Sequence, residues 1–353
     1  MAPYLIMALF PLICYGINSS RERSGYSERK LFYVVCMASV IIFFTCCRSV
    51  YLGSTDSVKY FAFIKDAYYF DSLSSFLAYS KAEKGFVAWI WLLTRIFEDP
   101  QVIFAINAMI ALIPVFWFIY KYAENVYFSV FLFITFGTYQ FLLQGMRQSM
   151  AMAICLIALD FARKRKIIPF VIAVGLAVLL HKSAIVFIPV YFIFSKWKHS
   201  KRTMFLVVLL SVLAIFLFSN FLDIANSYFD NKGYGDIIPG GVPTAIIWSM
   251  VVIGSILVFG KNKDNKAIIP FFYMTIIGVS FFFMRYTVAH VAERLAYYYI
   301  PASFVTIPVI VRQIDYRNKE LVRMIVIVVI FALYIYQISH SNLFPYSFFW
   351  SNN

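Results

Sequence analysis

Long apolar runs alternate with short polar or basic stretches along almost the whole chain of 353 residues. Most of these runs have about 17 residues or more, which is the lower limit for a helix that crosses a membrane. The pattern predicts an all-α polytopic membrane protein that forms a single integral membrane domain over residues 1–353. The apolar segments lie at 3–18, 31–47, 85–97, 100–120, 126–143, 145–162, 167–180, 183–195, 203–219, 244–260, 267–284, 295–311 and 324–340.

Composition supports the same fold class. The chain is 62% hydrophobic and 14% charged, with 39 Phe and 25 Tyr, whereas soluble domains carry about 25% charged residues. A chain this poor in charge cannot cover a globule with polar side chains, which excludes an ordinary soluble protein. The five cysteines lie in or beside apolar runs without metal-ligand spacing, so we expect packing roles for them and no metal or other cofactor.

The basic residues predict an orientation. Lys and Arg accumulate in cytoplasmic loops, and the basic stretches are 20–30, 163–166, 196–202, 261–266 and 312–323. All five stretches lie on the same side of the membrane only if one apolar segment between 20–30 and 163–166 does not cross it. Segment 85–97 is short and contains Arg95, so we predict a re-entrant half-helix there. About 12 crossings then remain, with both termini on the extracytoplasmic side. The positive cluster follows the first apolar run, which is the wrong order for a cleaved signal peptide.

The opposite side collects other polar residues. They lie in the extracytoplasmic loops 48–84 and 220–243 and in short turns between segments. Arg147 stands between two segments joined by almost no loop, and an ionisable group held near lipid depth suggests a functional site. The candidate residues are Arg48, Asp56, Tyr60, Glu83, Gln144, Arg147, Gln148, His181, Arg285, His290, Glu293 and Arg294.

Several of these residues also have structural interpretations. Arg48 and Arg285 each end an apolar run, where a long basic side chain can extend so that its charge lies at the membrane–water interface. Asp56 suits a helix cap, and His181 suits the ends of two short helices. In a helix, Glu293 and Arg294 share a face with His290, where a structural ion pair is the alternative. Aromatic residues in 220–243 fit either an interfacial belt or sugar stacking: Tyr228, Phe229 and Tyr234.

Together, the candidate residues indicate a site that binds a phosphate group. Arginine forks bind phosphate through two parallel hydrogen bonds, and a carboxylate or imidazole supplies a base. A lipid-linked pyrophosphate has its tail in the membrane and its anionic head at the surface, which fits this side. The chain has no Walker or Rossmann glycine pattern and no nucleophile elbow, so nothing indicates a bound nucleotide.

Short motifs in a fixed order resemble a known family. They are "GSTDS", "EKGF", "GMRQSMA", "HKSA" and "ERLAYY", spread over about 250 residues. This set is similar to the EpsG/Wzy-type polysaccharide polymerases of bacterial surface glycan assembly. One departure is Phe86, where the family often has Tyr. Segments 196–270 and 312–353 show no matching motif.

The resemblance implies a glycosyltransferase of the bacterial cytoplasmic membrane with its active site facing outside. It would transfer a growing glycan from undecaprenyl pyrophosphate onto the next lipid-linked repeat unit, without a nucleotide sugar. We expect Arg147 and Arg294 to bind pyrophosphate, followed by Arg48 and Arg285. For the base we favour His181 over Asp56, then Glu83 and Glu293. The expected further substrate contacts are Gln148, Gln144, His290 and Tyr60.

The resemblance also implies partners from the same pathway, namely a flippase and a chain-length regulator, and no nucleic acid. Rival hypotheses are an O-antigen ligase-like transferase with the same donor, a lipid-linked oligosaccharide flippase or transporter, and a structural scaffold. A ligase would use 220–243 as a dominant loop, and a transporter would line its path with polar residues. A structural scaffold would give Arg147 and His181 no functional role.

Overall fold

The structure is a computed structural model of the chain. The structure describes residues 1–23, 29–51, 55–195, 200–229, 242–262, 265, 267–285, 290–313 and 319–351. In this part of the chain, every named element is a helix, and the one extended contact is an isolated antiparallel bridge between Arg48 and Phe348. The helices form two compact units, described separately below. Unit 1 comprises 1–160, 168–185 and 324–353, and unit 2 comprises 161–167 and 186–323.

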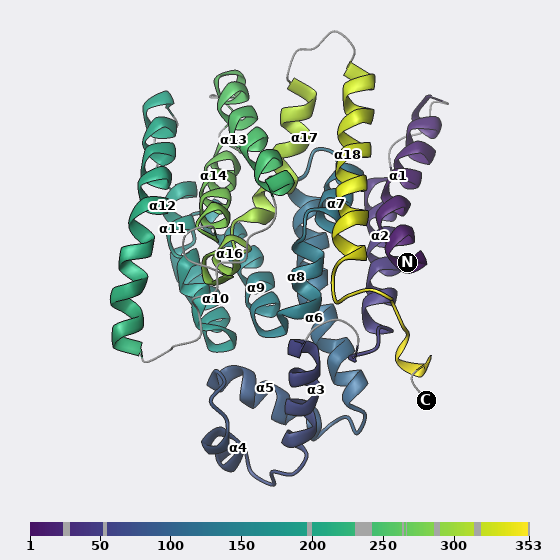
Figure 1. Cartoon of the computed structure of the whole chain (residues 1–353), viewed down its shortest axis with the longest axis vertical. Coiled ribbons are helices and arrows are strands. Elements are labelled where there is room, and N and C mark those ends of the chain that lie inside the picture. The colour runs from purple at the N-terminus through teal and green to yellow at the C-terminus, as the bar shows by residue number, and fades with distance from the viewer. Residues whose placement is uncertain are drawn as a thin grey trace. The chain divides into compact units, whose positions relative to one another are not determined.

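Unit 1 contains the N-terminal helices and the C-terminal helix (Figure 1). Helix α2 packs on α6, and α1 packs on α7. The last residues return to the first helices, since Tyr4 donates a hydrogen bond to the Leu343 carbonyl at 2.6 Å. The elements are α1 (Ala2–Arg23), α2 (Lys30–Cys46), α3 (Thr55–Ala67), α4 (Leu73–Tyr79), α5 (Lys84–Thr94), α6 (Pro100–Tyr122), α7 (Val126–Thr135), α8 (Thr138–Gln144), η3 (Phe349–Ser351), and most of α9 (Met146–Arg163), α10 (Ile167–Leu180), η1 (Lys182–Phe187) and α18 (Lys319–Ser339).

Local sequence signals explain where several of these helices begin. Asp99 accepts a hydrogen bond from the Gln101 backbone at the start of α6, and Pro100 occupies the first helical position. Asn125 caps α7 in the same way through the backbone N–H of Phe128. Each cap satisfies a backbone donor that the helix itself leaves unpaired.

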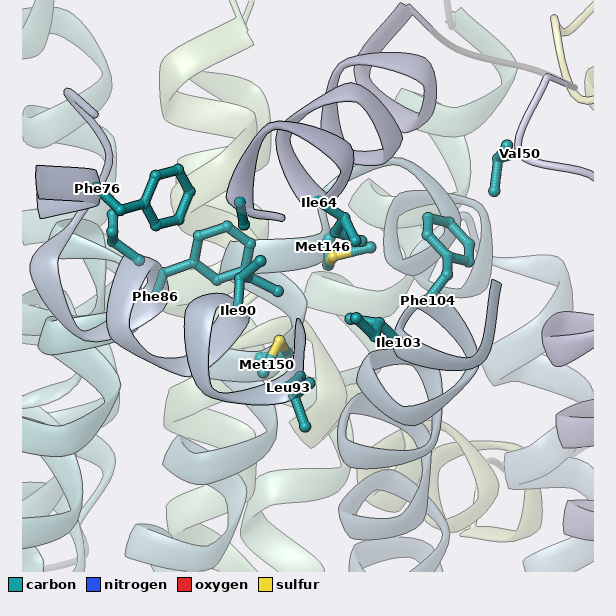
Figure 2. Packing of buried hydrophobic residues seen from close by; sticks show 12 residues of the cluster. Val50, Ile64, Phe76, Phe86, Ile90, Leu93, Ile103, Phe104, Met146 and Met150 are labelled. Carbon is teal, nitrogen blue, oxygen red and sulfur yellow. The ribbon is translucent and has the colours of Figure 1, made fainter. Parts of the chain in front are cut away.

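Three short helices form a layer at one end of unit 1, the α3–α5 layer (Figure 1). Helix α5 packs on both α3 and α4, the rings of Phe63 in α3 and Phe76 in α4 are in contact, and α3 and α5 also pack on α6. Buried apolar side chains join this layer to α6 and α9, and Figure 2 shows these side chains meeting between the helices. They are Val50, Ile64, Ala67, Phe76, Phe86, Val87, Ile90, Leu93, Ile103, Phe104, Met146 and Met150.

Unit 2 is organised around α14 (Ile269–Phe283), which is buried along most of its length. Its other elements are α11 (Pro189–Ser195), α12 (Lys201–Phe229), α13 (Val242–Asn262), α16 (His290–Ala296), η2 (Ile300–Ala302) and α17 (Ser303–Gln313). Helices α11, α12, α13, α16 and α17 each pack on α14. Gly254 allows α13 to approach α17, because an added Cβ would lie 2.7 Å from a methyl carbon of Ile310.

The predicted apolar segments correspond to helices, with three internal breaks. Segment 126–143 divides at Gly137, whose φ of 84° suits glycine, and α7 and α8 meet there at 53°. Segment 183–195 begins as a 3₁₀ helix, and 295–311 is divided among α16, η2 and α17. Residues 48–84, expected as a loop, contain α3 and α4.

Membrane crossing is supported by helix length and composition. Among the described residues, three helices are long and apolar enough to cross: Ala2–Arg21, Pro100–Tyr122 and Pro243–Asn262. The bent pair α7 and α8 gives a fourth if it forms one span. The number of about 12 membrane crossings and the extracytoplasmic placement of both termini therefore remain predictions. Helix α5 has 11 residues and extends only about 17 Å, so it is too short to cross a membrane alone, and re-entry at 85–97 remains a prediction.

Candidate functional site

One carboxylate of unit 1 bridges a guanidinium and an imidazole. Glu83 Oε2 lies 2.5 Å from Arg147 Nη1, and Glu83 Oε1 lies 3.0 Å from His181 Nδ1. The backbone N–H of Lys182 also donates to Glu83 Oε1, at 3.2 Å. Arg147 Nε donates a longer bond to the Tyr60 hydroxyl, at 3.4 Å. Four residues predicted separately from the sequence, Tyr60, Glu83, Arg147 and His181, thus meet in what we call the Glu83 cluster.

The cluster is partly sheltered and still open to a ligand. The exposed fraction of the side chain is 10% for Glu83, 21% for His181 and 29% for Arg147. Within the described part of the chain, Arg147 Nη2 and His181 Nε2 make no hydrogen bond. Both nitrogens are therefore available to bind an incoming group.

A close helix contact brings Glu83 beside His181. Glu83 immediately precedes α5, and His181 immediately follows α10. An added Cβ at Gly85 would lie 2.7 Å from both the Cβ and the carbonyl oxygen of Leu179. Only glycine permits this approach, because real Cβ contacts at that distance essentially never occur. The glycine of "EKGF" is therefore required by the geometry that joins two of the motifs.

A single-residue turn sets the position of Arg147. Gly145 separates α8 from α9, and Arg147 is the second residue of α9. The end of α8 is held in place by Arg48 and Ser57, which donate to the Leu143 carbonyl at 2.9 and 3.1 Å. Arg48 is only 1% exposed. A cation at a helix C-terminus stabilises the unpaired carbonyls there, so Arg48 anchors the turn that presents Arg147.

Aromatic rings orient the Arg147 guanidinium. Its Cζ lies 5.9 Å from the centre of the Tyr60 ring and 6.0 Å from that of Phe86. Phe86 stacks on Phe63 at 5.6 Å and belongs to the buried apolar cluster of Figure 2. Cation–π contacts of this kind favour a fixed orientation of the guanidinium plane. The polar cluster thus rests on a packed apolar base.

The charge state of Glu83 determines the tautomer of His181. Glu83 lies outside every predicted crossing segment. Burial alone would raise the pKa of its carboxyl, but the hydrogen bond from His181 and the charge of Arg147 lower that pKa to about 2. The ionised carboxylate can only accept, so Nδ1 of His181 must carry the proton. A neutral His181 then presents the lone pair of Nε2, the arrangement required of a general base.

A small cavity of about 20 Å³ lies beside the cluster, lined by Arg48, Tyr60, Asn107, Met146 and other residues. This volume holds about one water molecule. Asn107 accepts a hydrogen bond from Trp89 Nε1 at 2.8 Å and donates to Met146 Sδ at 3.4 Å. Asn107 therefore links α5, α6 and α9 beneath the cluster.

The other predicted residues of unit 1 lie outside the Glu83 cluster. Asp56 is the second residue of α3 and lies 3.8 Å from Lys59 Nζ, so the expected capping position before the helix is wrong. Gln144 ends α8 and is half-buried, while Gln148 is buried in α9. Neither glutamine contacts Glu83 or His181 through a hydrogen bond in the described residues.

The remaining candidates belong to unit 2. Arg285 donates to Glu293 at 3.1 Å, so the ion pair at this position joins Glu293 to Arg285. Arg294 is exposed. His290 begins α16, but its side chain lies outside the described residues, as do the side chains of Tyr228 and Phe229 and the whole of Tyr234.

Three features of the site were not predicted from the sequence. They are the contact of Phe86 with the guanidinium, the close approach at Gly85 and the N–H of Lys182. The motif "EKGF" indicated the close approach at Gly85, since a glycine beside a functional carboxylate often marks a point where two backbone segments lie very near each other. Among the described residues, no group of three His, Cys, Asp or Glu side chains is placed to hold a metal ion.

Comparison with protein families matches residues 31–348 to a family model described as the EpsG family. The match covers both units and all the motifs noted above. No curated protein and no solved structure matches the chain.

Proposed function

Since the chain belongs to the EpsG family, a family of Wzy-type polysaccharide polymerases, we propose a specific reaction for it. The protein transfers a growing glycan from a polyprenyl pyrophosphate carrier to a sugar hydroxyl of the next lipid-linked repeat unit. The reaction takes place on the outer face of the bacterial cytoplasmic membrane, and the carrier of the donor glycan is undecaprenyl pyrophosphate. The observation that carries this proposal is the bridging of Arg147 and His181 by Glu83.

His181 is the proposed base. Its Nε2 lone pair takes the proton from the acceptor hydroxyl while the hydroxyl oxygen bonds to the anomeric carbon of the donor sugar. The resulting imidazolium is stabilised by ionised Glu83 at 3.0 Å. It also lies at the end of α10, where the helix dipole favours positive charge. Glu83 itself is a poor base, because its pKa of about 2 leaves little affinity for a proton.

Arg147 is the proposed ligand of the leaving group. As the sugar–phosphate bond breaks, its electron pair passes to the pyrophosphate, and the growing charge is stabilised by the Nη2 side of Arg147. The first turn of α9 adds backbone N–H groups beside Arg147. Exposed lysines around the cluster increase the local attraction for a polyanion: Lys81, Lys84 and Lys182.

The other candidates receive supporting roles. Glu83 positions both Arg147 and His181, and Arg48 holds the α8 end through its contact with Leu143. Arg294 belongs to unit 2 and is exposed, and its binding of pyrophosphate stays a prediction. Arg285 is assigned to orienting Glu293, with which it pairs.

The test is reconstitution of the full chain in liposomes with a lipid-linked repeat unit, followed by sizing of the product. We expect a ladder of long chains from the wild type and single repeats from Arg147→Ala and His181→Ala. Matched controls are Arg95→Ala and His340→Ala, which change the same residue types elsewhere in unit 1. Ladders of wild-type length from both cluster variants would refute the assignment. Attachment of glycan to a different acceptor without polymerisation would identify a ligase.

A further inference from the structure

Unit 2 contains an apolar groove far along the chain from the Glu83 cluster. Its volume is about 430 Å³, within the range of roughly 300–1,000 Å³ typical of ligand sites. The groove lies between the first turns of α12 and the last turns of α13. It is lined by Met204, Phe205, Val208, Ile256, Leu257, Phe259 and Gly260.

The lining chemistry requires an apolar occupant. Every lining side chain is apolar, and Phe205 and Leu257 are 66% and 65% exposed. No donor or acceptor side chain in the groove could orient a sugar or a nucleotide. An alkyl chain fits, since it needs only apolar contact along its length.

Basic residues stand at one end of the same groove. Arg202 is exposed in the first turn of α12, two residues before the lining residue Met204. Lys261 is exposed and directly follows the lining residue Gly260, and its Nζ donates to the Gln313 carbonyl at 3.0 Å. The two cations thus stand where the apolar lining ends, and they belong to the basic stretches 196–202 and 261–266 of the sequence.

We propose that this groove binds an anionic phospholipid, with one acyl chain between α12 and α13 and the phosphate at Arg202 and Lys261. The apolar lining selects an alkyl chain, and the paired cations select a negative headgroup over a zwitterionic one. Because basic loops face the cytoplasm, the lipid belongs to the cytoplasmic leaflet. The site lies in unit 2 and uses none of the residues assigned to glycan transfer.

Gly260 offers a direct way to fill the groove. A Cβ at Gly260 meets no atom within 4 Å, so a larger side chain there occupies open space without a clash. Gly175 in α10 is equally open and exposed. Gly260→Leu and Gly175→Leu therefore make the same chemical change, and only the first one enters the groove.

The test is native mass spectrometry of the full chain, titrated with phosphatidylglycerol or phosphatidylcholine of identical acyl chains. Each basic residue near an anionic lipid strengthens binding about fivefold. With two such residues, Arg202 and Lys261, we expect phosphatidylglycerol to be retained roughly 30-fold more tightly than phosphatidylcholine. The double variant Arg202→Gln/Lys261→Gln should remove this preference, and Lys164→Gln/Lys166→Gln, with the same charge change, should keep it. Gly260→Leu should weaken retention of both lipids, and Gly175→Leu should not.

Equal retention of the two lipids by the wild type would overturn the proposal, as would unchanged retention in Gly260→Leu. Undecaprenyl phosphate is titrated in parallel. If it displaces phosphatidylglycerol and is retained more tightly, the occupant is a polyprenyl carrier and the proposal is wrong. A thermal unfolding measurement on every variant confirms that each retains its fold.

Discussion

Nδ1 of His181 lies 3.0 Å from Oε1 of Glu83, although 98 residues separate them in the sequence. The other oxygen of the same carboxylate lies 2.5 Å from Arg147 Nη1. One side chain therefore fixes the orientation of both the proposed base and the proposed ligand of the leaving group. This arrangement makes Glu83 the residue whose substitution distinguishes positioning from direct catalysis.

Glu83→Gln should lower the polymerisation rate by about 10²–10⁴-fold, the contribution typical of a positioned general base. The amide keeps the size of the side chain but no longer enforces the Nδ1–H tautomer of His181. The imidazolium that forms during proton transfer also loses its neighbouring negative charge, so the transition state is less stabilised. The measurement is the initial rate on a purified lipid-linked repeat unit from pH 5 to 9.

Glu98→Gln is the matched control for that experiment, because Glu98 is exposed and lies outside the cluster. Its rate and pH profile should equal those of the wild type. A wild-type rate in Glu83→Gln across pH 5 to 9 would show that the proposed positioning of His181 by Glu83 is wrong.

Arg147→Lys should recover only part of the activity lost in Arg147→Ala. The alanine variant should lose about 10²–10³-fold in rate, as expected when a donor to the developing charge is removed. Lysine restores the charge but not the planar fork that contacts Glu83 and a phosphate together. Single-turnover rates on the purified substrate measure this difference, with Arg95→Lys as control. Full activity in the lysine variant would show that the fork geometry is not required.

Gly85→Ala should destabilise unit 1 by about 1–3 kcal/mol, the usual cost of overpacking. The new Cβ would meet both the Cβ and the carbonyl oxygen of Leu179 at 2.7 Å. Since a backbone atom is involved, Leu179→Ala should not rescue the variant. Gly175→Ala, where a Cβ meets nothing within 4 Å, is the control. Thermal unfolding in detergent measures both, and equal stability of the two variants would contradict the close-contact argument.

The contribution of Glu83 to stability should depend on pH in one direction. The folded protein lowers the pKa of this carboxyl from 4.5 to about 2. The stabilisation is therefore fully present above pH 4.5 and is lost as the pH falls from 4.5 to about 2. The difference in unfolding free energy between the wild type and Glu83→Gln should be constant from pH 5 to 7 and shrink below pH 4.5. A difference that grows on acidification would have the wrong sign.

Arg48→Met should destabilise the protein by about 1.5–3 kcal/mol, because a charged donor to the Leu143 carbonyl is lost. Ser57→Ala removes a neutral donor to the same carbonyl and should cost about 0.5–1.5 kcal/mol. Folded Arg48→Met should retain the wild-type KM for the lipid-linked substrate. A raised KM together with unchanged stability would instead make Arg48 a ligand of the substrate.

Much of the fold could be predicted from the chain's pattern of apolar runs. Segment 85–97 was identified as too short to cross, and α5 has 11 residues. The break at Gly137 was missed because its neighbours are uniformly apolar, so hydropathy carries no signal for a bend. Within 48–84, a helix beginning near Asp56 was one of the interpretations and corresponds to α3, whereas α4 was missed because its polar and aromatic residues resemble a surface loop.

The sequence predicted which residues belong to the candidate site but not which of them contact one another. Arg147 was chosen because an ionisable group near lipid depth is costly unless it has a function, and Tyr60, Glu83 and His181 were chosen because they fall on the same predicted side. Their ranking changed once their contacts were known, since Glu83 moved from a candidate base to a positioning group and Arg48 to a helix anchor. Phe86 was noted only as a departure from the family, whereas its ring lies 6.0 Å from the Arg147 guanidinium.

The sequence by itself determined the helical membrane class, the family and the residues that carry charge in apolar surroundings. Each of these follows from local composition and order along the chain. Only the tertiary structure decided that Glu83 binds Arg147 and His181 with its two oxygens, because these residues come from three separate helix ends. Their meeting depends on the close approach of α5 and α10 at Gly85 and on the turn at Gly145. Packing between distant segments sets such distances, and no local pattern encodes them.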